Sequence, residues 1–311
     1  MSYVLTVTLN PCIDKTVTVE RFTFGGLNRA VTEREDPGGK GINVSKVLTK
    51  MGAENLATGI LFGDSGRKIK KELDSLKIKN DFLISDGGET RTNMKLIESA
   101  SGEVTEINGV GAEVSPDLLS EFIEKYSSLL EEAAIVILAG SAPRGVPRDI
   151  YKTLTEKANR KGVKVILDAD GDLLKNGIGA APFMIKPNIH ELSRLLGEEL
   201  DENDLTTATK PFIGGGIGIV AVSMGKEGST FFTEKEALRV SALPVEGGCA
   251  TGAGDSMVAA SAYSLMNGFE LSKLARYASA AGSATASKKG TEVCDLDEII
   301  GGAEKVSVKI I

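Results

Sequence analysis

The sequence predicts an α/β protein in which helices cover a central, mostly parallel β-sheet. Apolar β-branched stretches alternate with amphipathic helical stretches over much of the chain, which is typical of parallel sheets. Residues 134–140 (AIVILAG) form a continuous apolar run, as expected of a strand buried on both faces. The chain has 311 residues, 41% of them hydrophobic, which is enough to build one large core. Because no linker divides it, we expect a single domain over 1–311.

The expected elements follow one another as strand, helix, strand. Strands are predicted at 3–9, 134–140, 163–168, 183–188 and 219–225, with an antiparallel edge pair at 229–233 and 237–243. Helices are predicted at 42–52, 68–76, 115–132, 148–161, 190–197, 255–267 and 271–287. Residues 206–218 carry Pro211 and three glycines at 214–216, so a helix there should be short or distorted.

Between about 81 and 107 the pattern changes to short alternating stretches separated by Asp-Gly-Gly and Ser-Gly turns. Residues 16–20 alternate in the same way. Such stretches are typical of antiparallel strands with one face in water. We expect them to form a flap outside the central sheet.

Composition excludes several classes of protein. The chain has 36 basic and 43 acidic residues and a net charge of −7, with no basic runs, so we expect neither nucleic-acid nor membrane binding. Three cysteines without a CxxC pair and a single histidine argue against a disulfide framework and a His-rich metal centre. The N-terminus does not resemble a signal peptide, and the expected location is cytoplasmic.

Polar residues follow the predicted strands where each one ends. They are Asn10, Asp14, Gly140, Ser141, Asp168, Lys186, Asn188, Ser223 and Gly225. Ligands of open α/β sheets bind outside the carboxyl ends of the strands. We therefore expect these residues to share one crevice.

The segment CATGAGDS (249–256) places Asp255 directly after a glycine-rich turn. One interpretation is a loop followed by a helix that Asp255 caps. The other is a cradle in which backbone N–H groups at a helix start stabilise the charge of a transferring phosphoryl group, with Asp255 as the base. A second glycine-rich segment, PGGKGINVS (37–45), places Lys40 at a helix start.

Seven segments together resemble the ribokinase-like (PfkB) carbohydrate kinases. They are TLNPCID, PGGKGINVSKVL, ETRTNMKL, LAGSAPRGVP, KPNIHE, VSMGKEG and ATGAGDS, and they span nearly the whole chain. The resemblance implies a ribokinase-like fold with a small β-sheet lid, which the strands within about 10–36 and 88–108 would form. It also implies ATP and Mg²⁺ as cofactors and a homodimer joined through the lid.

Within this family the segments are most similar to the 1-phosphofructokinase branch, with tagatose-6-phosphate kinases a close second. The resemblance thus implies ATP-dependent phosphorylation of fructose 1-phosphate to fructose 1,6-bisphosphate. Tagatose 6-phosphate, fructose 6-phosphate or an unphosphorylated sugar or nucleoside are alternative substrates. An alternative of another class is a non-catalytic sensor of sugar phosphates on a kinase fold.

The resemblance also implies a role for each matching residue. Asp255 would be the general base, and Gly252, Ala253 and Gly254 would form the anion hole. The residues implied to hold the sugar phosphate are Asp14, Arg29, Gly39, Lys40, Asn43, Arg91 and Ser141. Those implied to face ATP are Lys186, Asn188, Glu191, Ser223, Gly225, Gly228 and Gly254. Glu191, acting through water, and Asn188 would hold Mg²⁺.

Some of these residues have plainer interpretations. Arg91 fits either a bidentate contact with a substrate phosphate or an ion pair within the lid. Asp168 either orients loops or touches a ligand. His190 is expected to be a surface or packing residue, and Cys12 and Cys249 to be small buried thiols.

Overall fold

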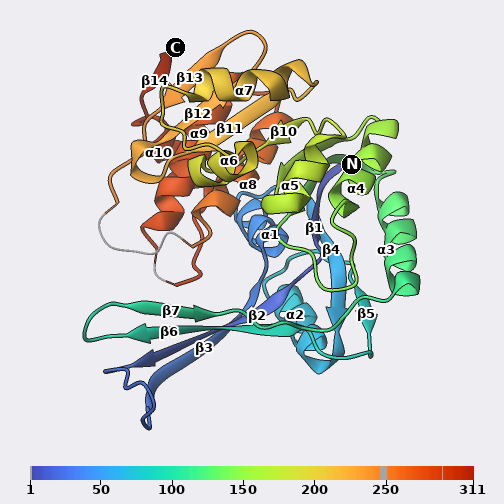
Figure 1. The fold of residues 1–311 in the computed structure, drawn as a ribbon, viewed down its shortest axis with the longest axis vertical. Helices are drawn as coiled ribbons and strands as arrows, with labels where there is room; N and C mark the ends of the chain where they lie inside the picture. The colour runs from blue at the N-terminus through green and yellow to red at the C-terminus, as the bar shows by residue number, and fades with distance from the viewer. Residues whose placement is uncertain (1, 246–250, 289) are drawn as a thin grey trace.

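The computed structural model describes residues 2–245, 251–288 and 290–311, and they contain two β-sheets (Figure 1). The central sheet has ten strands in the order β14-β13-β12-β11-β10-β9-β8-β1-β4-β5. Its parallel strands are β1 (Tyr3–Thr8), β4 (Asn55–Phe62), β5 (Leu83–Ser85), β8 (Ala133–Ala139), β9 (Lys164–Asp168), β10 (Met184–Ile185) and β11 (Ile219–Ser223). Three antiparallel strands complete one edge: β12 (Ser229–Phe232), β13 (Ala237–Val240) and β14 (Val308–Ile310).

Helices pack on both faces of the central sheet, and each face has its own apolar core. One core includes α3 (Pro116–Leu129), α4 (Ile150–Arg160), α5 (Gly171–Ile178), α6 (Ile189–Leu196) and α7 (Leu205–Gly214). The other includes α1 (Lys40–Lys50), α8 (Ala253–Met266), α9 (Leu271–Ala286) and α10 (Leu296–Ala303). The two-layer covering explains why β8 is apolar on both faces. The predicted α/β class, with a mostly parallel sheet, is confirmed.

A separate four-stranded sheet, called the small sheet here, projects from one end of the molecule (Figure 1). Its order is β3-β2-β6-β7, with bounds β2 (Cys12–Val19), β3 (Ala30–Gly38), β6 (Arg91–Glu98) and β7 (Val104–Ile107). Its edge strand β3 runs directly into α1. Helix α2 (Gly63–Ser75) contacts both β2 and β4 and so lies where the two sheets meet.

Two details of the flap prediction are wrong. Residues 83–85 pair with β4 as the edge of the central sheet, so they do not belong to the small sheet. The two middle strands of the small sheet, β2 and β6, are parallel, because the chain passes through α1, β4 and α2 before it returns. The outer pairs are antiparallel, as predicted.

Strands β4 and β14 and helices α5 and α10 were not predicted from the sequence. The helix expected to be short or distorted within 206–218 is α7, which contains Pro211 and ends at Gly214. No helix in the described part of the chain combines the length and apolarity needed to cross a bilayer.

Candidate active site

A cavity of about 1410 Å³ lies where the carboxyl ends of the central strands face the small sheet. Polar residues after β1, β8, β10 and β11 line it, including Asn10, Ser141, Lys186 and Ser223. The start of α8 and strand residues of the small sheet complete the lining. The parallel sheet thus brings together residues that are far apart in sequence.

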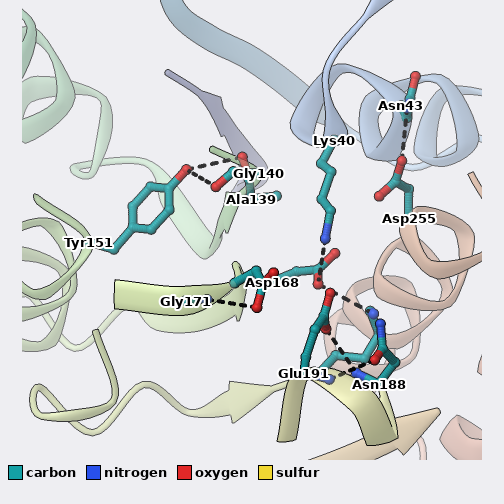
Figure 2. A network of polar contacts seen from close by, with 12 residues as sticks. Lys40, Asn43, Ala139, Gly140, Tyr151, Asp168, Gly171, Asn188, Glu191 and Asp255 are labelled. Atoms are coloured by element: carbon teal, nitrogen blue, oxygen red, sulfur yellow. Dashed lines mark hydrogen bonds and ion pairs between the residues drawn. The ribbon is translucent and has the colours of Figure 1, made fainter. Parts of the chain in front are cut away.

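Asp255 lies at this cavity in the first turn of α8 and is only 6% exposed. The Asn43 side chain in α1 donates a hydrogen bond from Nδ2 to Asp255 Oδ2 over 2.8 Å (Figure 2). Burial raises the pKa of Asp255 to about 6, and the nearby Asp168 charge adds to the shift, while Lys40, Asn43 and Lys186 oppose it. A carboxyl group with this pKa is suited to accept a proton near neutral pH.

The cap of α8 excludes the interpretation in which Asp255 caps the helix. Gly252 is the N-cap, with φ of 82° in the left-handed region, so Asp255 does not cap the helix. The first helical bond runs from Ser256 N to Gly252 O over 2.9 Å, which leaves the N–H groups of Ala253 and Gly254 outside the helical bonding pattern. Together with the positive end of the helix dipole, they form a site suited to an anion beside Asp255.

Lys40 and Lys186 both pair with one buried carboxylate, that of Asp168, next to the cavity. Asp168 Oδ1 lies 3.2 Å from Lys40 Nζ and 3.3 Å from Lys186 Nζ (the Lys40 contact is drawn in Figure 2). Burial alone would raise the pKa of Asp168, but the two ammonium groups lower it below its usual value. Asp168 itself does not line the cavity, whereas both lysines do. It thus acts on the site through the lysines, which favours the orienting interpretation.

The small sheet supplies the opposite wall, where Asp14 is held in place. Asn93 Nδ2 donates to Asp14 Oδ1 over 3.1 Å, and the Cys12 thiol donates to the same oxygen over 3.2 Å. Gly38 lies so close to Asp14 that an added Cβ would stand 2.1 Å from Asp14 Oδ2. Any larger residue at 38 would displace the carboxylate.

Arg91 also lines this wall and donates from Nη2 to the Asn10 carbonyl over 3.1 Å. It takes part in no ion pair within the described residues, so the interpretation of an ion pair in the lid finds no support there. Its buried Nε has no hydrogen-bond partner among the described residues. A ligand oxygen would satisfy such an unpaired cationic donor.

Asn188 and Glu191 form a capping box at the start of α6, facing the same cavity. Asn188 Oδ1 accepts from Glu191 N over 2.8 Å, and Glu191 Oε2 accepts from Asn188 N over 2.9 Å (Figure 2). The box fixes both side chains at the cavity, and it uses the single side-chain oxygen of Asn188 and one of the two carboxylate oxygens of Glu191. No cluster of three His, Cys, Asp or Glu residues suited to a metal occurs in the described chain.

Most predicted site residues meet at the cavity, with one exception. The lining includes Asp14, Gly39, Lys40, Asn43, Arg91, Ser141, Lys186, Asn188, Glu191, Ser223, Gly225, Gly228, Gly252, Ala253, Gly254 and Asp255. Arg29 is exposed in the connection between β2 and β3 and does not line the cavity. His190 is exposed on α6, as expected, and Cys12 is buried. Cys249 lies outside the described residues.

Four residues at this site, on the small sheet or directly after it, were not predicted from the sequence. Asn93, Glu106 and Asn108 line the cavity, and Lys95 Nζ donates to Thr251 Oγ1 over 2.9 Å. Residues 91, 93 and 95 alternate along β6, so they share one face of the strand. That alternation in TRTNMKL was the signal that could have identified Asn93 and Lys95 once Arg91 was chosen.

The fold and the cavity together define an α/β protein with a buried carboxylate, Asp255, in the first turn of a helix at the cavity. The model of the pfkB family of carbohydrate kinases matches residues 7–298. The chain therefore belongs to the pfkB family of carbohydrate kinases, and it is a phosphotransferase that acts on a sugar hydroxyl.

Relatives with assigned names are similar over nearly the whole chain. A 1-phosphofructokinase of Bacillus subtilis is 37% identical over 294 residues, covering 93% of this chain and 95% of that protein. A 1-phosphofructokinase of Xanthomonas campestris is 37% identical over 283 residues, covering 89% and 88%. Among solved structures, phosphofructokinase-2 of Escherichia coli in complex with potassium has a TM-score of 0.92 at 27% identity, covering 98% and 99%.

Proposed function

We propose that this protein transfers a phosphoryl group from MgATP to the 6-hydroxyl of fructose 1-phosphate. The observation that carries the proposal is the buried Asp255 next to N–H groups that lie outside the helical bonding pattern at the start of α8, in the same cavity as Arg91. The names of the relatives, 1-phosphofructokinase in four organisms at 31–37% identity, favour this acceptor over other sugar phosphates.

In this proposal Asp255 accepts the proton of the attacking hydroxyl, and Asn43 keeps its carboxylate aimed at that hydroxyl. The N–H groups of Ala253 and Gly254 stabilise the charge that grows on the transferring group. Lys186 lies beside them, because a Cβ added to Gly254 would stand 3.3 Å from Lys186 Nζ. Lys40, held by the same Asp168 oxygen as Lys186, adds a second cation.

The residues present fit ATP and Mg²⁺. Glu191 keeps one carboxylate oxygen outside the capping box, and Asn188 Oδ1 has a second lone pair beside its bond to Glu191 N. Such oxygen ligands are the chemistry that Mg²⁺ prefers, and Mg²⁺ usually keeps several waters and binds through phosphates. When bound, the ion would neutralise phosphate charge and orient the phosphoryl group for transfer. The backbone near Ser223, Gly225 and Gly228 would flank the nucleotide.

Arg91 is proposed to bind the phosphate of the sugar. We expect Arg91→Ala to raise KM for the phosphosugar by roughly 10- to 100-fold, the effect of losing a charged hydrogen-bond partner, with little change in KM for ATP. Steady-state kinetics with each substrate varied in turn measures both values. Arg67→Ala, an exposed arginine of α2, is the matched control. An unchanged KM for the phosphosugar would mean that Arg91 does not bind the phosphate.

The substrate itself is tested by a coupled assay of ADP release at constant salt. We expect kcat/KM for fructose 1-phosphate to exceed the values for tagatose 6-phosphate, fructose 6-phosphate and unphosphorylated fructose. A preference for a 6-phosphate would retain the phosphoryl-transfer chemistry but reverse the orientation of the sugar. Binding of nucleotide with no ADP release from any of the four would favour the sensor alternative.

A second copy of the chain is proposed to pack against the small sheet, which would act as a lid over the cavity. Apolar side chains of this sheet and of its β2–β3 connection are exposed, among them Ile107 at 61% on β7 and Phe24 at 94% and Leu27 at 78% in the connection. Contiguous exposed apolar side chains mark interaction surfaces. Light scattering should give twice the chain mass of 32.7 kDa, and Phe24→Asp with Leu27→Asp should give the monomer mass. A wild-type monomer at micromolar concentration would reject the dimer.

A further inference from the structure

Lys46 is a polar residue near the site that the proposed chemistry does not use. It lies on α1 three residues after Asn43, on the same side of the helix, and it does not line the cavity. Its Nζ donates to the Pro37 carbonyl over 2.5 Å and lies 3.5 Å from Asn43 Oδ1. Lys46 is half-buried, and lysine side chains that lose contact with water usually have hydrogen-bond partners.

The three contacts form a chain from the end of the small sheet to Asp255. Pro37 is in the last residues of β3, at the junction with α1. Lys46 joins that junction to the oxygen of the Asn43 amide. The nitrogen of the same amide then donates to Asp255 Oδ2 over 2.8 Å, a contact drawn in Figure 2.

The charge of Lys46 favours the same orientation of the Asn43 amide as the bond to Asp255 does. An amide oxygen only accepts hydrogen bonds, and the amide nitrogen only donates them. With the oxygen toward the ammonium group, the nitrogen faces the Asp255 carboxylate, and both contacts are attractive. Turned by 180°, the amide would place its oxygen against the carboxylate and its nitrogen against the ammonium group, and both contacts would be repulsive.

We propose that Lys46 is a positioning residue for phosphoryl transfer, which fixes the Asn43 amide and through it the Asp255 carboxylate. The proposal rests on the proposed role of Asp255 as the base. Burial lowers the pKa of Lys46 below its usual value; Asp36, Asp14 and Cys12 oppose that shift, and Arg34 adds to it. Through its contacts with Pro37 and Asn43, the same lysine links the position of the small sheet to the orientation of the Asp255 carboxylate.

A double-mutant cycle of Lys46→Met and Asn43→Ala tests the proposal in the full-length enzyme. We expect Lys46→Met to lower kcat by about tenfold, the effect of a misdirected hydrogen bond to a charged group. If Lys46 acts through Asn43, the double variant should be no slower than Asn43→Ala alone. Lys46→Arg should recover most of kcat. Additive losses, or an unchanged kcat in Lys46→Met, would overturn the proposal.

The pH profile of kcat gives a readout that a purely structural role would not move. Asp255 faces Asp168, Lys40 and Lys186 besides Asn43, and the Asn43 bond favours its ionised form. Lys46→Met should therefore move the acid limb to higher pH. Lys50→Met is the matched control, because Lys50 is on the same helix and donates to the Val293 carbonyl over 2.6 Å, away from Asn43. It should leave both kcat and the acid limb unchanged.

Two further variants, Lys46→Gln and Asp255→Asn, separate a folding defect from a loss of positioning, and a failure of this proposal from a failure of the proposed function. Should Lys46→Met fail to fold, Lys46→Gln, which removes the charge and keeps a donor for Pro37, replaces it in the same cycle. If Asp255→Asn retains kcat, the proposed function fails. If Asp255→Asn loses kcat while the Lys46 variants retain it, only the role of Lys46 fails.

Discussion

Asp255→Asn should lower kcat by at least roughly 10²- to 10⁴-fold, the contribution typical of a positioned general base. Asparagine has nearly the same shape, and the Asn43 side chain can still contact its amide oxygen, so the helix and the anion site should persist. The loss would thus report proton transfer and not folding. Steady-state ADP release with saturating substrates measures kcat.

The control for this variant is Asp297→Asn, an exposed acid in the first turn of α10. It removes the same kind of helix-terminal charge far from the cavity and should leave kcat unchanged. A near-normal kcat in Asp255→Asn would contradict the assigned base.

The same residue predicts the pH dependence of the wild-type enzyme. Asp255 must be ionised to accept a proton, and its pKa is raised to about 6. The kcat/KM of the free enzyme should therefore fall as pH drops through about 6 and level off above it. The residual activity of Asp255→Asn should lack this limb.

Asp168→Ala should lower the free energy of unfolding by about 3–5 kcal/mol, the cost of removing one partner from a buried ion pair. Asp168 is 1% exposed and Lys186 is 5% exposed, so the variant leaves an ammonium group without its partner in a desolvated site. Urea unfolding with an unchanged m-value measures the loss.

A surface ion pair provides the comparison. Glu202 pairs with Arg239 over 2.7 Å, and its side chain is 57% exposed. Glu202→Ala should therefore cost less than about 1 kcal/mol. If Asp168→Ala cost no more than Glu202→Ala, Asp168 would not be the anchor of the two lysines.

The sequence was most informative where burial forces a pattern. The apolar run of β8 and the polar residues after each parallel strand predicted the sheet and the place of the cavity, because both follow from covering a sheet with helices. It was less informative where contacts are non-local. Strand β6 lies parallel to β2 only because the chain passes through the central sheet between them. The alternation of apolar and polar residues within each strand does not predict that pairing.

The same limit applies to the site. Asp255, Lys40 and Arg91 could be named from glycine-rich turns and motif spacing. The hydrogen bond of Asn43 to Asp255 joins residues 212 positions apart, and the two lysines on Asp168 come from α1 and the end of β10. Such pairs are set by the packing of α1 and α8 against the sheet, so only the folded chain shows them.

The position of the new phosphate tests the central claim most directly. Purified enzyme is incubated with fructose 1-phosphate and MgATP, and ³¹P NMR identifies the product. The proposed reaction predicts one product with phosphate monoesters at both C1 and C6, formed in step with ADP and absent with Asp255→Asn. ADP formation without a bisphosphate, or a bisphosphate formed only from C6 esters, would contradict it.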